Sequence, residues 1–147
     1  MPPIPPPNDA AAVIAALGLA AHPEGGWYRE TFRSVATDGG RSPVTAIHFL
    51  LTAGQASHWH RVDADEIWCW HAGSPLALGQ AANAAAPALW QTLGPDVFAG
   101  QAPQAVVPAG QWQAARAEIG WALVSCIVAP GFDFAGFTLA PPGWSPG

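Results

Sequence analysis

The chain has 147 residues, of which half are apolar and a tenth are charged, and its formal net charge is −5. This length corresponds to a single domain, which we assign to residues 8–144, between an N-terminal tail of residues 1–7 and a C-terminal tail of residues 145–147. The low charged content predicts that part of the surface is covered in a homodimer. All basic residues are arginines, and they are too few for a basic patch that would bind nucleic acid.

No targeting or membrane-spanning segment is expected. The longest apolar runs, such as Trp121–Val124, fall far short of the ~20 residues that a spanning helix needs. The proline-rich segment 1–7 lacks the basic start and apolar core of a signal peptide, and we expect it to be extended or disordered. Cys69 and Cys126 lie in apolar contexts typical of buried free thiols, so the expected location is cytoplasmic.

The order of apolar runs and turn residues predicts one helix followed by short strands. Asn8 or Asp9 can cap a helix over Ala10–Leu17, and Gly18 follows its end. Runs rich in aromatic and β-branched residues, separated by Gly and Pro, predict strands at 27–33, 44–52, 75–78, 89–93, 104–107, 112–115, 120–129 and 132–139. The alanine-rich segment 81–89 is expected to be a loop. This pattern is typical of an all-β antiparallel sandwich or barrel with a short N-terminal helix.

The stretch 54–73 concentrates residues that can perform chemistry. His58 and His60 are two apart, so on a strand both side chains point to the same face. A turn would then form a hairpin whose second strand begins at Glu66, while His71 points to the opposite face. If the two faces meet, His58, His60 and Glu66 converge.

Three kinds of site fit this set. Two imidazoles and a carboxylate are a ligand set for iron, manganese, zinc or nickel. Without a metal, the carboxylate of Glu66 would orient the imidazole of His60 and raise its pKa, which gives a proton-transfer pair. Both histidines could also be structural, bonded to Glu66 and to the backbone. The residues alone leave the three interpretations open.

The spacing of these residues resembles the first motif of the cupins, which is matched by Gly54, His58, His60, Glu66 and Gly73. Pro108–Gly110 and Gln113, preceded by Gly100, are similar to the second cupin motif. Three further segments resemble one branch, the DUF985 or cupin-5 family, namely residues 22–33, 65–68 and 129–134. The resemblance covers residues 10–144.

This resemblance implies a cupin double-stranded β-helix, or jelly-roll barrel, that is commonly dimeric and holds a small-molecule pocket in its lumen. The barrel of this branch is similar to that of RmlC-type sugar-nucleotide epimerases, but a fold does not determine a reaction.

Two departures from the cupin motifs bear on metal binding. The gap between His60 and Glu66 is longer than usual, so His60 takes the place of the first metal-binding histidine and Val62 that of the second. Gln113 stands where the second motif supplies a third histidine. A metal site would therefore need His58 to reach inward beside His60 and Glu66.

We therefore predict a pocket for a small polar metabolite, with His60 and Glu66 as the catalytic pair of an isomerase- or epimerase-like enzyme. The side chains expected to contact the ligand are Glu24, Arg29, His58, Trp68, Trp70 and Gln113. His22, before Pro23, is expected only to form a turn.

Two alternatives accompany this prediction. One is a metal-dependent cupin, such as an oxygenase or a metallo-isomerase, with a divalent metal bound by His58, His60, Glu66 and Gln113. The other is a non-catalytic binding protein.

Overall fold

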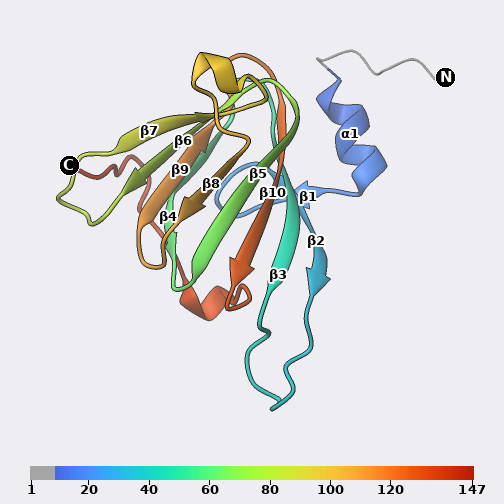
Figure 1. The fold of residues 1–147 in the computed structure, drawn as a ribbon, viewed down its shortest axis with the longest axis vertical. Helices are drawn as coiled ribbons and strands as arrows, with labels where there is room; N and C mark the ends of the chain where they lie inside the picture. Colours follow the sequence, from blue (N-terminus) through green and yellow to red (C-terminus); the bar gives the residue numbers. More distant parts are fainter. Residues whose placement is uncertain (1–8) are drawn as a thin grey trace.

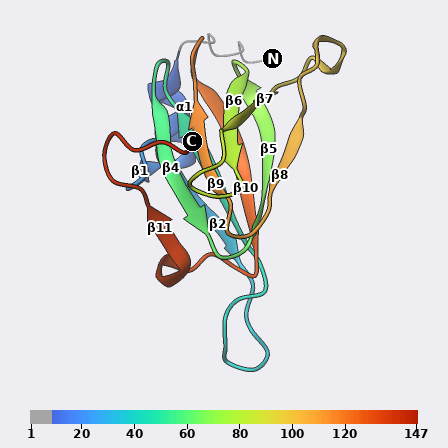
Figure 2. The ribbon, with the colours of Figure 1, turned by 90° about the vertical axis from the view of Figure 1, so that its left-hand side faces the viewer.

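The computed structural model describes residues 9–147, so the proline-rich tail expected over residues 1–7 lies outside the described part. Two antiparallel sheets face each other and enclose the core (Figure 1). The six-stranded sheet has the order β1 (Ala20–Ala21), β2 (Trp27–Arg33), β3 (Thr45–Leu51), β10 (Ala122–Ala129), β5 (Asp65–Gly73) and β8 (Gln104–Val107). The five-stranded sheet has the order β11 (Phe137–Leu139), β4 (Ala56–Val62), β9 (Trp112–Arg116), β6 (Leu76–Ala81) and β7 (Leu89–Leu93) (Figure 2). This is the all-β fold predicted from the sequence.

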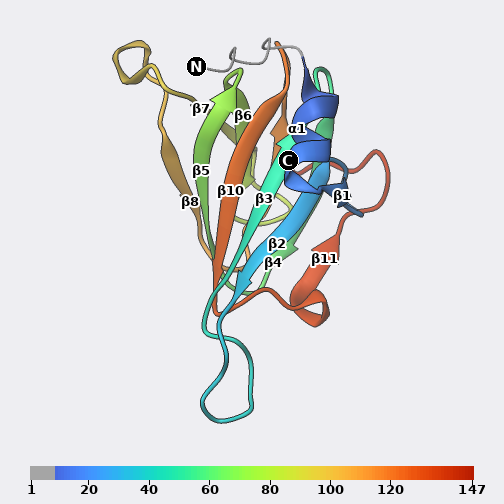
Figure 3. The same ribbon diagram turned by 90° about the vertical axis from the view of Figure 1, so that its right-hand side faces the viewer.

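The helix α1 (Ala10–Leu17) has the predicted bounds and both predicted caps. The Asp9 side chain accepts a hydrogen bond from the Ala12 amide, and Gly18 ends the helix with a φ of 65°. The helix covers one end of the outer face of the six-stranded sheet, where its apolar side chains pack near Leu50 and Trp121 (Figure 3). Within residues 9–147, no helix is long and apolar enough to cross a membrane.

The main core lies between the two sheets, where alternating side chains of facing strands point inward. Phe49, Trp68, Leu78 and Val124 are among its fully buried members. Each such side chain stabilises the fold by about 1.5–3 kcal/mol through the apolar surface that it removes from water. This packing holds the inner faces of β3, β5 and β10 rigidly on one side of the lumen.

Two segments differ from, or refine, the strand prediction. The strand expected over 132–139 is shortened to β11, because the Asp133 side chain accepts from the Ala135 amide and starts the 3-10 helix η2 (Phe134–Gly136). The loop of the β6–β7 hairpin covers residues 82–88, within the predicted loop 81–89, and Asn83 caps a turn within it. A second 3-10 helix, η1 (Val97–Ala99), lies between β7 and β8.

The predicted hairpin between His60 and Glu66 is wrong. β4 pairs with β9 and β11, whereas β5 pairs with β10 and β8, so the two strands belong to different sheets. The residues between them turn the corner from one sheet to the other. His60 and Glu66 therefore lie on facing inner surfaces of the two sheets.

Two β-bulges change which side chains face the lumen. In β4 the register shifts between Ser57 and His60, so the two-residue spacing of His58 and His60 does not place both side chains on one face. In β2 the register shifts between Glu30 and Phe32, which places Phe32 opposite Ala46 on the outer face. The expected simple alternation fails at both positions because each bulge inserts one extra residue.

Candidate functional site

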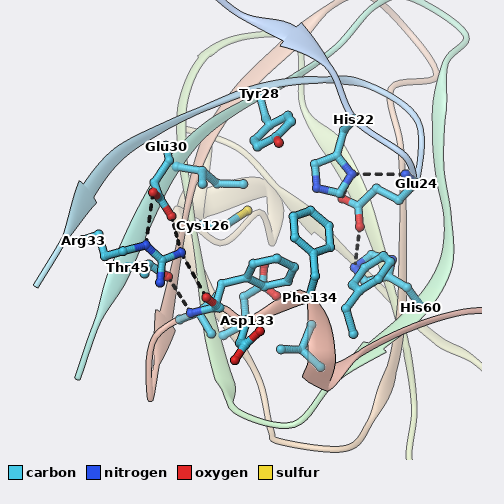
Figure 4. A pocket seen from close by; sticks show the side chains of 16 residues that line it. His22, Glu24, Tyr28, Glu30, Arg33, Thr45, His60, Cys126, Asp133 and Phe134 are labelled. Carbon is cyan, nitrogen blue, oxygen red and sulfur yellow. Dashed lines mark hydrogen bonds and ion pairs between the residues drawn. The ribbon is translucent and has the colours of Figure 1, made fainter. Parts of the chain in front are cut away.

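A cavity of about 480 Å³ lies between the two sheets, under the segment that follows β10. One end is buried and contains Glu24, His60, Glu66 and Cys126. The other end is open and contains Glu30, Arg33, Asp133 and Phe134. Figure 4 shows His22, Glu24 and His60 on one side of the cavity and Glu30, Arg33 and Asp133 on the other. The volume suits a small metabolite.

Glu24 enters the buried end on a tight turn before β2. The turn is closed by hydrogen bonds from the His22 amide to the Gly26 carbonyl and from the Gly25 amide to the His22 carbonyl. Gly25 has a φ of 101°, and a Cβ there would lie 2.5 Å from the Ala56 carbonyl oxygen. Glycine is required because the turn lies directly against β4.

The bulge in β4 completes this contact. It frees two backbone groups of His58 from pairing with β9. The His58 amide donates to the Glu24 carbonyl at 2.7 Å, and the His58 carbonyl lies 2.7 Å from Nδ1 of His60. The His58 side chain turns away, with its Nε2 2.9 Å from the Pro141 carbonyl. His58 thus serves the site through its backbone.

His60 is held at both ring nitrogens. Nδ1 carries a hydrogen because it bonds to the His58 carbonyl, and Nε2 lies 2.9 Å from Oε2 of Glu24. Burial alone would lower the pKa of His60, but the carboxylates of Glu24 and Glu66 and the His58 carbonyl raise it to about 9. His60 is therefore a buried imidazolium at neutral pH.

His22 stands beside the same carboxylate but is neutral. Its Nδ1 accepts the Glu24 amide at 3.1 Å and so carries no hydrogen, although it also lies 3.9 Å from Oε1 of Glu24. Burial lowers the pKa of His22, and this outweighs the opposing effect of Glu24. The 3.9 Å contact is therefore not an ion pair, and the charged partner of Glu24 at this end of the cavity is His60.

Glu66 is the second carboxyl of the buried end, and it is bonded to Gln113 rather than to His60. Nε2 of Gln113 donates to Oε1 of Glu66 at 3.1 Å, and Oε1 of Gln113 accepts from the Trp68 indole at 2.9 Å. The Cys126 thiol, which lines the same cavity, also favours the ionised form of Glu66 and so lowers its pKa. Burial raises the pKa of Glu66 to about 7, against the opposing effect of the His60 charge. Near neutral pH this carboxyl can hold or release a proton.

The open end is bordered by an ion pair and aromatic rings. Arg33 bonds to both carboxylate oxygens of Glu30, at 2.6 and 3.2 Å, and to the Phe132 carbonyl. The Phe132 amide donates to the Thr45 hydroxyl oxygen, which ties this wall to β3. Phe132, Phe134 and Phe137 pack edge to face along the cavity.

Of the predicted site residues, Glu24, His60 and Glu66 line the cavity. Arg29 does not, because its guanidinium donates to the Leu17 carbonyl at the end of α1. Trp68 and Trp70 belong to the main core, and the Trp70 indole donates to the Ser74 carbonyl. Gln113 is buried behind Glu66 and outside the cavity lining.

Several cavity residues carried no clear sequence signal. Four of them, His22, Tyr28, Glu30 and Arg33, belong to the 22–33 segment, whose dense polar and aromatic content is the only indication in the sequence. The position of Arg33 depends on the β2 bulge. The aromatic residues 132, 134 and 137 reach the cavity because η2 interrupts the expected strand.

The donor atoms in the cavity do not suit the expected divalent metal. Nε2 of His60 bonds to Glu24, the His58 side chain lies elsewhere, and the Gln113 oxygen accepts from Trp68. Among residues 9–147, no group of three His, Cys, Asp or Glu side chains is placed to hold a metal ion. A metal at Nε2 of His60 would require this nitrogen to lose its hydrogen and to break its bond with Glu24.

The sequence matches the family described as the Cupin superfamily (DUF985) over residues 11–140. A similar solved structure is protein SO0799 from Shewanella oneidensis, with 40% identity and a TM-score of 0.82 over 89% of this chain and 84% of that one. A hypothetical protein from Leishmania major shows 34% identity and a TM-score of 0.79 over 90% of this chain and 88% of that one.

Likeness of fold extends to oxalate decarboxylase from Bacillus subtilis, with 14% identity and a TM-score of 0.61. The match covers 81% of this chain and 29% of that enzyme, which is described as having Mn(II) centres. No protein of curated function matches the chain.

Proposed function

Because this chain belongs to the DUF985 family of the cupin superfamily, we propose that it binds a small polar metabolite in its lumen and catalyses proton transfer on it. The reaction type is that of an isomerase or epimerase. The observation that carries the proposal is the pair of buried carboxyls around one imidazolium. Glu24 bonds to His60, while Glu66 has a pKa of about 7 and faces the same cavity.

The two carboxyls have different roles in this proposal. Ionised Glu66 takes a proton from a carbon beside a carbonyl group of the ligand, and the electron pair of that C–H bond moves onto the carbonyl oxygen as an enolate. The positive charge of His60 stabilises the enolate. In an isomerisation, the hydroxyl group on that carbon passes its proton to the enolate oxygen, and protonated Glu66 delivers its proton to the former carbonyl carbon. In an epimerisation, the His60 imidazolium instead donates a proton to the opposite face of the same carbon, and Glu66 keeps the proton that it took. No electrons are gained or lost overall.

The walls of the cavity support the choice of ligand class. Charged and polar side chains stand at both ends, and aromatic rings lie between them. Such a cavity suits a short molecule with polar groups at each end and an apolar face in the middle. The open end includes Arg33, whose pairing with Glu30 leaves part of its guanidinium for a ligand oxygen.

Isotope exchange tests the proposal. The protein is incubated in D₂O with a panel of hydroxy acids, keto acids, ketoses and aldoses, and loss of C–H signals beside carbonyl groups is followed by proton NMR. We expect exchange of at least one compound by the wild type, its loss in Glu66→Gln, and its retention in Glu118→Gln, which changes an exposed carboxylate outside the cavity lining. Equal exchange by Glu66→Gln and wild type would contradict the role of Glu66, and binding without any exchange would favour a non-catalytic binding protein.

The metal-dependent alternative has its own measurement. If His60 were a ligand, addition of Mn(II), Zn(II) or Ni(II) after chelation would raise the melting temperature of the wild type but not that of His60→Gln. We expect no such difference, because Nε2 of His60 is already bonded to Glu24. A stabilisation that depends on His60 would restore the metal-dependent alternative.

For the assembly, we propose a homodimer that forms on the outer face of the six-stranded sheet. The strand registers place five apolar side chains in one row across this face, namely Phe32, Ala46, Ile127, Ile67 and Val106. The two ends of the row, Phe32 and Val106, are more than half exposed. A second copy could cover the row without bringing like charges together, because the row contains no charged residue.

A further inference from the structure

A chain of two hydrogen bonds runs from the core to the proton-transfer carboxyl. The Trp68 indole nitrogen donates to Oε1 of Gln113 at 2.9 Å, and Nε2 of Gln113 donates to Oε1 of Glu66 at 3.1 Å. Trp68 and Gln113 are each 1% exposed and Glu66 is 6% exposed. Both hydrogen bonds are therefore shielded from water. The loss or reversal of a hydrogen bond costs the most free energy in such a buried place.

The chemistry of tryptophan determines which way the Gln113 amide points. The indole N–H can only donate, so the atom of Gln113 that faces it must be the oxygen. The amide nitrogen then faces Glu66 and donates to it. The reversed amide would place the NH₂ group against the indole N–H and the oxygen against the carboxylate, and both contacts would be repulsive.

We propose that Trp68 is a positioning residue, which acts through Gln113 to keep an N–H donor on Oε1 of Glu66. The proton of the neutral carboxyl is then held by Oε2, because Oε1 is engaged as an acceptor. Only the use of this proton in a reaction rests on the proposed function. The orientation itself follows from the three buried side chains.

The two hydrogen bonds from Trp68 through Gln113 to Glu66 form a relay, which acts together with the other groups that face Glu66. His60, Gln113 and Cys126 favour the ionised carboxylate, whereas burial and the charge of Glu24 favour the neutral acid. Removing Trp68 frees the Gln113 amide to turn its oxygen toward Glu66. An oxygen in that place accepts a hydrogen bond from the O–H of the neutral acid and repels the carboxylate, so the neutral acid is stabilised.

The test is the titration of Glu66, followed by carboxyl carbon NMR in Trp68→Phe and in the matched control Trp70→Phe. Phenylalanine keeps an aromatic ring but lacks the indole donor. We expect the midpoint of Glu66 to rise by about one pH unit in Trp68→Phe, as for the loss of one hydrogen bond to a charged group. Trp70→Phe should leave the midpoint unchanged, since the Trp70 indole donates to the Ser74 carbonyl.

A second variant tests whether Trp68 acts through Gln113. Gln113→Met removes the amide and should raise the midpoint in the same direction, and adding Trp68→Phe to it should change nothing further. A midpoint in Trp68→Phe equal to that in Trp70→Phe would overturn the proposal, and so would additive shifts in the double variant. These titrations need no substrate. If they succeed while no compound exchanges deuterium, the relay stands and the proposed catalytic function fails.

Discussion

Nε2 of His60 lies 2.9 Å from Oε2 of Glu24, a residue of the turn before β2 and not part of the His60–Glu66 motif. The contact depends on two backbone features, the glycine turn that brings Glu24 against β4 and the bulge that presents the His58 amide and carbonyl. The histidine expected to pair with Glu66 is thus held as a cation by a different carboxylate. Glu66 remains available for proton transfer.

Glu24→Gln should lower the pKa of His60 from about 9, because Glu24 provides both the strongest charge interaction and the side-chain hydrogen bond that oppose burial. The measurement is an NMR titration of the His60 ring. Glu30→Gln is the matched control, since Glu30 lines the same cavity but pairs with Arg33. An unchanged His60 titration in Glu24→Gln would show that the 2.9 Å contact does not hold the imidazolium.

The stability of the protein should fall as the pH rises from 7 to 8.5. The pKa of His60 is about 9 in the folded chain and near 6.5 in the unfolded chain, so its stabilising effect is complete below 6.5 and is lost as the pH approaches 9. The expected decrease in the free energy of unfolding is about 1–2 kcal/mol over this interval. Urea denaturation at several pH values measures it.

The matched variant for this pH effect is His60→Gln, which has no titrating ring at this position. Its stability should depend much less on pH between 7 and 8.5. The lowered pKa of His22 acts below 6.5, and the raised pKa of Glu66 affects the wild type mainly below 7. Because His60→Gln removes the charge that opposes the effect of burial on Glu66, both proteins are compared in a Glu66→Gln background. If the free energy of unfolding changed with pH to a similar extent in both proteins, the pH dependence would belong to groups other than His60.

Gly26→Ala should destabilise the fold more than Gly39→Ala. Both glycines have positive φ, 87° and 74°, so alanine is strained at either position. A Cβ at Gly26 would also lie 2.7 Å from the Phe49 ring and 2.8 Å from Leu51, whereas a Cβ at Gly39 would meet no atom within 4 Å. We expect the extra overlap to cost about 2 kcal/mol in chemical denaturation. Equal losses of stability in the two variants would mean that the core side chains around the turn move aside at no cost in free energy.

Val106→Glu and Phe32→Glu should each shift the proposed homodimer toward monomer. Both side chains are more than half exposed in the single chain, so a carboxylate there need not disturb folding, but it would be buried and unpaired in the dimer. Sedimentation velocity measures the assembly, and circular dichroism checks the fold. Phe98→Glu is the control, because Phe98 is fully exposed and lies on η1, away from the row. A dimer unaffected by both row variants would place the interface elsewhere.

Local patterns predicted much of the fold. The capping residues around α1 and the alternating strands, such as β2 with its bounds Trp27–Arg33, came directly from residue type and spacing. The prediction failed where an extra residue or a turn altered the alternation, at the bulges in β2 and β4 and at η2. Bulges depend on the partner strand, and the partner is distant in sequence.

The sequence by itself determined the family, the all-β fold and the concentration of chemistry around His60 and Glu66, because motif spacing and strand periodicity are local properties of the chain. Only the tertiary structure decided that these two residues face each other from different sheets, that Glu24 holds the imidazolium, and that Gln113 bonds to Glu66. Those relationships arise from strand pairing and close packing, which join segments far apart in the sequence.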